Sequence, residues 1–407
     1  MTGDPRVRRA RRLTVTGLVA LVLLAAGAYL PAALLVPVAP AAPTVVDLAL
    51  PAVDAPEVVL PAYGAAAVEA LDVPGTRTLA GDPGRRSIAS ISKVVTALVV
   101  LEERPLGGGD GGAVTFTDAD AALREEYLAV DGKVAPLAAG TTLTERQVVQ
   151  VMLVESANNY ATALARWAFG DDAAFVAAAR DWLTEHDLDD TTIVEPTGLS
   201  PDNRSTTADL LELGRLALAD PDVAAIVRTT SLEVPGIGLV ENSNELLGVD
   251  GVVGIKTGTL DAAGACLLFA ADQVVDGVAT TVVGVVLGGA DHRSLDRDVQ
   301  ALLTSVAART VTVTPVRAGD VLATYETPWG GRATAVASED ATATVWGDAE
   351  ARAVTDVGPV RDGADGDVVG EVVVEVGDET VTVPLRLDGD LPGPDGWWRL
   401  THPDRLF

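Results

Sequence analysis

Lysine is nearly missing from this sequence. The chain has 407 residues and 29 basic side chains, of which only Lys93, Lys133 and Lys256 are lysines. Arginine stays protonated at physiological pH, whereas a buried lysine amine can lose its proton. Lys93 and Lys256 stand in the motifs described below, and this context favours a chemical role for these two lysines.

Cysteine and histidine are equally scarce. Cys266 is the only cysteine, so no intrachain disulfide can form, and its apolar surroundings over 265–271 predict a small core residue rather than a nucleophile. His186, His292 and His402 are the only histidines, and the chain has no Gly-x-Ser-x-Gly elbow. Three scattered histidines disfavour both a serine hydrolase with a histidine base and a zinc peptidase, and we expect no metal and no cofactor.

Positive charge is also in deficit, with a net charge of −29. A nucleic-acid-binding protein needs clustered lysine and arginine for its phosphate contacts, so we expect no nucleic-acid partner. We attribute the acidity to solubility. The length suggests two globular domains, and 48% apolar residues are enough for a sizeable core.

The basic residues are distributed unevenly along the chain. Five arginines lie within the first twelve residues, and residues 13–36 then carry no charge. About 20 apolar residues span a bilayer, and a cationic flank favours the cytoplasmic side. We predict a cytoplasmic tail over 1–12, a single-pass anchor over 13–36 and an extracytoplasmic body. The alternative is a secretory signal peptide cleaved near Ala39-Pro40-Ala41, and both interpretations export the protein.

The rest of the chain divides into a spacer, a mixed region and a β-rich region. Residues 37–60 are rich in proline and predict an extended spacer. Thr144 and Gln147 form a capping-box pattern at the start of a helix that should end near Glu155. The other predicted elements are a strand over 65–71, a turn at Pro74-Gly75, helices from Ser90 and over 158–169, 172–186 and 207–219, and strands over 265–271 and 277–287.

Helical periodicity disappears near residue 310. Short alternating strands separated by glycine, aspartate and proline follow, and four of the six tryptophans lie in this part of the chain. We therefore predict a catalytic domain over 61–308 and a separate small all-β domain over 311–407. The predicted strands of the second domain are 311–316, 321–325, 341–345, 372–376 and 381–387.

The first motif is Ser90-Ile91-Ser92-Lys93, at the start of a predicted helix. Ser90 and Lys93 are three residues apart and therefore share one helix face. A neutral amine at that spacing can accept the serine proton, and the helix N-terminus offers free N–H groups to a developing oxyanion. The same pattern also fits an N-cap serine followed by a surface lysine.

Two further motifs follow along the chain. Ser156-Ala157-Asn158 combines a hydroxyl and an amide just beyond a helix, although a simple helix end has the same composition. Lys256-Thr257-Gly258-Thr259 follows an apolar run and fits a strand edge where glycine permits close approach of a ligand. An ordinary strand-to-turn junction fits this last pattern as well.

Together the three motifs are a strong signal. Ser-x-x-Lys, Ser-x-Asn and Lys-Thr-Gly in this order resemble the motif set of penicillin-binding proteins and class A β-lactamases. Their surroundings over 62–305 are similar to the low-molecular-mass D-alanyl-D-alanine carboxypeptidases, the peptidase S11-like branch. Ala157 departs from the glycine usual there, and the C-terminus lacks that branch's amphipathic anchor helix. The stretches that carry the resemblance are 87–103, 152–164, 194–199, 205–218 and 244–271.

The resemblance implies a fold, an activity and a site. It implies a mixed α/β (α+β) catalytic domain with an antiparallel sheet flanked by helices, followed by the all-β domain. The implied enzyme is a serine D-Ala-D-Ala carboxypeptidase that acts on peptidoglycan stem peptides and is acylated by β-lactams. The implied catalytic residues are Ser90 as nucleophile, Lys93 as base and Ser156 as proton relay, and the implied substrate-binding residues are Asn158, Lys256, Thr257, Gly258 and Thr259.

Two other functions remain open on the sequence. A class A β-lactamase would need a Glu-x-x-Leu-Asn element after the second motif, whereas this chain has Glu195 in Glu-Pro-Thr-Gly-Leu. A non-catalytic penicillin sensor or wall-binding module would keep the residues needed for acylation but would not turn over. A burst of D-alanine without continued release would identify the sensor.

Overall fold

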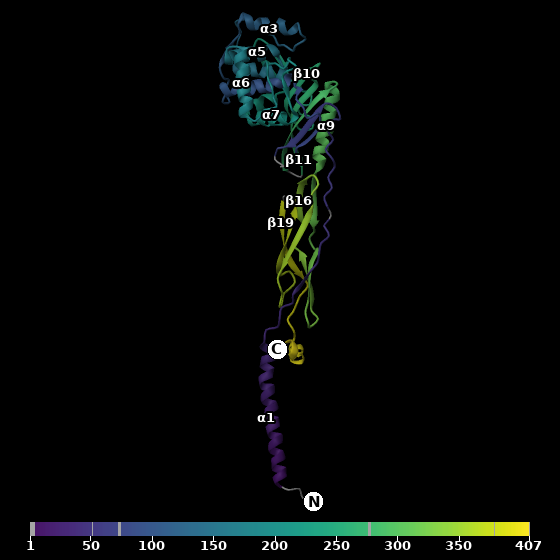
Figure 1. The fold of residues 1–407 in the computed structure, drawn as a ribbon. Helices are drawn as coiled ribbons and strands as arrows, with labels where there is room; N and C mark the ends of the chain where they lie inside the picture. The colour runs from purple at the N-terminus through teal and green to yellow at the C-terminus, as the bar shows by residue number, and fades with distance from the viewer. Residues whose placement is uncertain (1–4, 51, 72–74, 276–277, 378, 407) are drawn as a thin grey trace. The chain divides into compact units, whose positions relative to one another are not determined.

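A computed structural model describes residues 5–50, 52–71, 75–275, 278–377 and 379–406. The chain forms two compact units (Figure 1). One unit consists of residues 55–310, and the other combines residues 1–54 with 311–407. Of the predicted turn at Pro74-Gly75, Pro74 lies outside the described residues.

The unit of residues 55–310 contains a five-stranded antiparallel sheet in the order β10-β11-β12-β2-β3. Its strands are β10 (Val252–Leu260), β11 (Gly264–Val275), β12 (Val278–Gly289), β2 (Ala65–Ala70) and β3 (Thr78–Gly81). Six short strands form three further antiparallel two-stranded pairs: β4 (Arg86–Ser87) with β7 (Arg204–Ser205), β5 (Ala113–Thr115) with β6 (Thr142–Thr144), and β8 (Ser231–Val234) with β9 (Gly238–Glu241).

Helices cover both faces of the five-stranded sheet. Successive strand residues point to opposite faces, and Leu268 and Val283 belong to the main core, where α7 (Thr207–Ala219) packs. The helix α9 (His292–Arg309) also packs on β11 and β12, and Figure 1 shows it on the other side of the sheet from α7. The fully buried Cys266 lies in the main core, as predicted.

The remaining helical segments of this unit carry two of the three motifs. They are η1 (Ala89–Ile91), α2 (Ser92–Glu103), α3 (Asp118–Leu128), α4 (Glu145–Gln150), the π-helical turn η2 (Val151–Glu155), α5 (Asn158–Phe169), α6 (Asp172–Glu185) and α8 (Pro221–Val227). The capping box of Thr144 and Gln147 is confirmed, and Glu155 ends the helical run as predicted.

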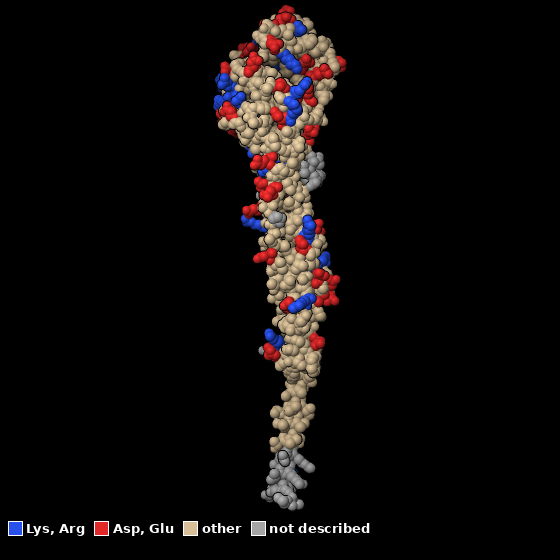
Figure 2. Space-filling view, turned by 90° about the vertical axis from the view of Figure 1, so that its right-hand side faces the viewer, with Lys and Arg blue, Asp and Glu red and all other residues tan. Residues whose placement is uncertain are grey.

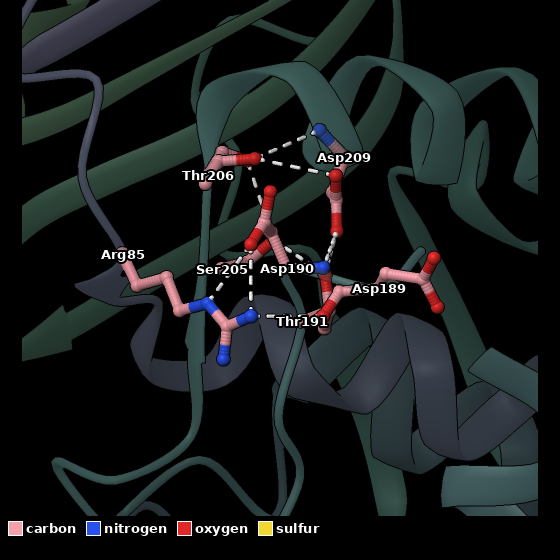
Figure 3. Close-up of polar contacts among 7 residues, drawn as sticks. All are labelled: Arg85, Asp189, Asp190, Thr191, Ser205, Thr206 and Asp209. Carbon is pink, nitrogen blue, oxygen red and sulfur yellow. Dashed lines mark hydrogen bonds and ion pairs between the residues drawn. The ribbon is translucent and has the colours of Figure 1, made fainter. Parts of the chain in front are cut away.

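A polar cluster fixes the segment between α6 and β7 (Figure 3). Arg85 forms an ion pair with Asp190 at 2.8 Å, but both side chains are exposed and such pairs contribute little. The buried contact between the hydroxyls of Thr191 and Ser205, 2.7 Å apart, and the 2.8 Å bond from Thr191 to Asp209 are the stronger constraints. This cluster holds the base of a loop that reaches the site described below.

The second unit is built around a six-stranded antiparallel sheet in the order β1-β14-β15-β19-β18-β17. Alternating small and β-branched residues bury one face in a separate core. The bounds are β1 (Pro43–Val45), β14 (Val321–Glu326), β15 (Arg332–Ala337), β19 (Glu379–Asp388), β18 (Val368–Val376) and β17 (Ala351–Val357), and β13 (Thr310–Val316) pairs with β16 (Ala341–Trp346).

Part of the segment predicted as a spacer belongs to this β-rich unit. β1 pairs with β14, Ala41 forms a bridge with Val360, and Val53 forms a bridge with Ala349. Ala41 and Val53 are buried in the core of the unit. At these positions the proline-rich stretch is therefore hydrogen-bonded to the β-rich unit rather than left to solvent.

The N-terminal helix α1 (Pro5–Leu35) contains one span, Leu13–Leu35, that is long and apolar enough to cross a membrane by length and composition. On the face that Figure 2 shows, no Lys, Arg, Asp or Glu is seen over this apolar span. The C-terminal helix α10 (Gly396–Thr401) packs against α1, with Arg399 donating to the carbonyl of Val36 at 2.7 Å. The short helical turn η3 (Pro403–Arg405) follows α10.

Candidate active site

One cavity of about 650 Å³ in the unit of residues 55–310 brings the three motifs together. Lys93 and Lys256, with exposed fractions of 0% and 1%, are buried beside the residues of this cavity. The cavity joins the start of α2, the start of α5 and the strand β10, so segments far apart in sequence share one site. The sequence-predicted residues that line it are Ser90, Ser156, Asn158, Thr257, Gly258 and Thr259.

The Lys93 amine lies against the Ser90 hydroxyl. Its Nζ is 2.9 Å from Ser90 Oγ, 2.6 Å from Asn158 Oδ1 and 2.6 Å from the carbonyl oxygen of Thr197. A neutral amine has two N–H donors and one lone pair. If it donates to the two carbonyl-type oxygens of Asn158 and Thr197, its lone pair is left for the proton of Ser90.

Burial lowers the pKa of Lys93 from 10.5 to about 7. Removing an ammonium group from water disfavours the charged form, and this effect outweighs the opposing influence of the Glu195 carboxylate. The nearby charge of Lys133 lowers the pKa further. At neutral pH a large fraction of Lys93 is therefore the free amine that a proton acceptor must be.

Glu195 organises the loop that contacts Lys93. Its carboxylate accepts hydrogen bonds from the backbone N–H of Thr197 at 2.7 Å, of Gly198 at 2.7 Å and of Ser200 at 3.2 Å, and from the side chain of Asn203 at 3.1 Å. These bonds fix the carbonyl of Thr197 that accepts from Lys93. Glu195 is occupied within its own loop and does not line the cavity.

The second motif turns sharply into the cavity. Ser156 has a φ of +69°, a left-handed conformation that is uncommon for serine and follows the π-helical turn η2. Strained backbone of this kind is concentrated at functional sites. The backbone N–H of Asn158 then donates to the carbonyl of Lys133 at 2.8 Å, which ties α5 to the opposite loop.

The third motif lies on β10, an edge strand of the sheet. A Cβ at Gly258 would come within 3.1 Å of the backbone nitrogen of Ser90 and 3.2 Å of the carbonyl of Ile88. A side chain at this position would press on the chain segment carrying Ser90, so glycine is favoured there. The sequence suggested a close approach here by a ligand, and the structure shows a close approach by the protein's own backbone.

Lys256 is buried without a hydrogen-bond partner among the residues that the structure describes. Burial lowers its pKa well below the ordinary value, and the charges of Lys93 and Lys133 act in the same direction. A buried polar group without a partner is costly and calls for an explanation. An anionic ligand in the adjacent cavity would supply the missing partner.

His292 also lines the cavity, although it belongs to none of the three sequence motifs. Its Nε2 is 2.7 Å from the hydroxyl of Thr259, and both residues line the cavity. Burial, followed by the charge of Lys256, lowers its pKa, so the neutral ring predominates at pH 7. No sequence pattern links a residue at the start of α9 to the third motif, because only the fold brings them together.

Lys133 is the second missed residue. It lines the cavity from the loop that follows α3, so all three lysines of the chain belong to this one region. The scarcity of lysine was a sequence signal that could have pointed to Lys133 as a residue of the site. The other histidines lie elsewhere, since His186 stacks on Trp182 and His402 on Trp398.

Comparison with known proteins gives one family. Residues 79–290 match peptidase S11, described as D-alanyl-D-alanine carboxypeptidase. The chain is 31% identical over 204 residues to D-alanyl-D-alanine endopeptidase of Escherichia coli, covering 45% of this chain and 58% of the relative. It is 26% identical over 251 residues to the D-alanyl-D-alanine carboxypeptidase DacA of Escherichia coli, covering 61% of each. The chain thus spans about three fifths of these relatives.

Solved structures show the same fold. Penicillin-binding protein 5 from Haemophilus influenzae superposes with a TM-score of 0.57 at 20% identity, covering 84% of this chain and 99% of that one. The Streptomyces K15 DD-transpeptidase gives a TM-score of 0.54 at 25% identity, covering 62% and 98%. The expected catalytic fold with a C-terminal all-β region is confirmed.

Proposed function

Because the chain belongs to the peptidase S11 family, D-alanyl-D-alanine carboxypeptidase, we propose that it removes the terminal D-alanine from peptidoglycan stem peptides through an acyl-enzyme on Ser90. The observation that carries this proposal is the contact between Ser90 Oγ and a buried Lys93 amine at 2.9 Å. A penicillin would acylate the same serine.

Acylation begins when Lys93 takes the proton of Ser90. The serine oxygen attacks the carbonyl carbon between the two D-alanines, and the oxyanion receives N–H groups from the backbone of Ser90 and Thr259. Each such donor contributes a few kcal/mol of transition-state stability. The C–N bond then breaks, and Ser156 relays a proton to the amine of the departing D-alanine.

Substrate binding uses the two walls of the cavity. Asn158 holds the substrate amide on the side of α5. Lys256, Thr257 and Thr259 bind the terminal carboxylate along β10, and this anion gives the buried Lys256 amine a partner that the described residues do not supply. Water then releases the acyl group from Ser90. Because Glu195 is engaged by its own loop, it does not supply the water-activating carboxylate of a class A β-lactamase.

Two measurements test the proposed function. Release of D-alanine from a peptide ending in D-Ala–D-Ala should continue over many turnovers, whereas a single burst would favour the penicillin-sensing alternative. Labelled penicillin followed by peptide mapping should place the label on Ser90, and Ser90→Ala should abolish labelling. Label on Ser92 or Ser156 would contradict the assignment. A cross-linked dimeric peptide in the same assay would reveal endopeptidase activity like that named for one relative.

We also propose that residues 13–36 anchor the protein in the membrane with its body outside. The apolar span of α1 is 6% buried, so its surface is available to lipid. The arginines before it favour the cytoplasmic side. Cell fractionation and sequencing of the mature N-terminus test the anchor. A soluble form beginning near residue 40 would support the cleaved signal peptide instead and would leave the proposed chemistry unchanged.

A further inference from the structure

Lys133 occupies a wall of the cavity that the proposed reaction does not use. The loop between α3 and β6 lines the cavity with Asp131, Gly132, Lys133 and Val134. It is hydrogen-bonded to the start of α5 through the N–H of Asn158, and β10 lines the same cavity. None of the three motifs includes Lys133, and the steps described above need no group from it.

The backbone of this loop is held on both sides of Lys133. The carbonyl of Lys133 accepts from the N–H of Asn158 at 2.8 Å, and Ala135 exchanges two hydrogen bonds with the side chain of Asn159, at 3.2 and 2.9 Å. A Cβ at Gly132 would lie 2.8 Å from Asn158 Nδ2, so glycine permits the loop to press against α5. Lys133 is therefore presented from a fixed position.

The side chain of Lys133 is free within this fixed frame. It is exposed, and among the described residues its ammonium group forms neither a hydrogen bond nor an ion pair. Its charge nevertheless reaches the site, because it contributes to the lowered pKa of both Lys93 and Lys256. An exposed lysine on a flexible stem, beside a cavity that binds peptide, is suited to an anionic group of the ligand.

We propose that Lys133 forms a subsite for a carboxylate in the acyl part of the substrate, on the residue that precedes D-Ala–D-Ala. This inference rests on the proposed function. In the proposed reaction the terminal carboxylate is bound along β10 by Lys256, so an anion held by Lys133, on the loop bonded to α5, comes from another part of the peptide. The carboxyl groups of side chains are the remaining anions of such a peptide.

A matched pair of substrates isolates this subsite. One peptide carries an acetylated aminoadipyl residue before D-Ala–D-Ala, and the other carries the side-chain amide of the same residue. The two differ by one charge and have the same length. The full-length wild-type protein should show a kcat/KM about five to ten times higher for the acid, the effect expected of one exposed charge-assisted hydrogen bond. The difference should lie mainly in KM and should shrink at high salt.

Substitutions at Lys133 should change the preference in a defined order. Lys133→Ala should bring the ratio of the two kcat/KM values close to one, Lys133→Glu should invert it, and Lys133→Arg should preserve it. Arg180, exposed on α6 and away from the cavity lining, provides the control. Arg180→Ala removes a positive charge from the same unit and should leave the ratio unchanged.

An unchanged ratio in Lys133→Ala and Lys133→Glu would overturn the subsite. Failure of the proposed function has a different signature, because wild-type protein would then release D-alanine from neither peptide. In that case competition of the two peptides with labelled penicillin for Ser90 still decides the inference. Stronger competition by the acid, lost in Lys133→Glu, would support the subsite, and equal competition would refute it.

Discussion

The surroundings of Lys93 and Lys256 differ although both amines are buried at the same cavity. Lys93 has three oxygen atoms within 2.9 Å, on Ser90, Asn158 and Thr197. Lys256 has no hydrogen-bond partner among the residues that the structure describes. The first environment needs no further partner, whereas the proposed binding of an anion in the cavity would complete the second.

This difference separates two ways of using a lysine. A proton acceptor needs a fixed position and a free lone pair, and the oxygen atoms around Lys93 provide both. A group that binds an anion needs an unused donor, and burial keeps the Lys256 amine from donating to water. The cost of leaving a buried donor unpaired is about 1–3 kcal/mol, and we interpret that cost in Lys256 as the reserve that substrate binding releases.

The largest effect should come from Lys93→Arg. The guanidinium keeps the charge but cannot act as a base near neutral pH, so the rate of acylation by labelled penicillin should fall by about 10²- to 10⁴-fold. Lys256→Arg provides the matched comparison and should lose much less, because a guanidinium still binds a carboxylate. Equal losses in two variants with unchanged melting curves would show that the two lysines do not have different roles.

Acylation should also depend on pH through Lys93. Its pKa of about 7 means that the amine is protonated, and inactive as a base, below neutrality. The acylation rate should therefore rise about tenfold per pH unit at acidic pH and level off above about 7. A stopped-flow profile of the wild-type protein measures this. A plateau that begins only above pH 9 would indicate that the protonated form persists and that another group accepts the proton.

Replacing each of the two lysines should change the free energy of unfolding differently. Lys256→Met removes a buried amine that has no hydrogen-bond partner among the described residues, and it should raise the free energy of unfolding by about 1 kcal/mol. Lys93→Met also removes three hydrogen bonds, so its free energy of unfolding should lie below that of Lys256→Met. Folding lowers the pKa of Lys256. Between that lowered pKa and the ordinary value of 10.5, the unfolded chain therefore holds more protons than the folded chain, and the stability of the wild-type protein increases as the pH rises through this range. The advantage of Lys256→Met, measured by denaturant titration, should therefore shrink at alkaline pH.

The smallest effect should come from His292, whose ring contacts the hydroxyl of Thr259. His292→Ala removes the partner 2.7 Å from the Thr259 hydroxyl and should raise KM about threefold to tenfold with little change in kcat, as expected for one lost hydrogen bond. His292→Asn retains a polar partner and should recover part of the loss. An equal change in kcat and KM for both variants would indicate a general disturbance of α9 instead.

Local signals explain why much of the fold was predictable. The predicted helix over 207–219 matches α7 at both ends, and the predicted pair over 158–169 and 172–186 differs from α5 and α6 at a single terminal residue. Capping residues and helical periodicity lie within one turn of what they specify. The strands β15 and β17 alternate in burial but were missed, because their inward positions are largely small residues that give little hydrophobic contrast; β15 buries Ala333, Ala335 and Ala337.

The site shows the same limit. Ser90 and Lys93 are three residues apart, so a local pattern suffices to connect them, and the order of the three motifs indicates the family. Lys133 and His292 reach the cavity through a loop pressed against α5 and through the start of a helix packed on the sheet. Such proximity depends on tertiary packing, which no spacing in the sequence records.

The pairing of β1 with β14 has a consequence for how the chain folds during synthesis. Thr44 can pair with Thr324 only after Thr324 has been synthesised. The whole unit of residues 55–310 is synthesised between these two residues. Domains generally fold as units while the chain emerges, and pairings between distant residues form slowly. The unit of residues 55–310 should therefore acquire its native structure first. The β-rich unit, whose two chain segments lie before and after it in the sequence, should fold last.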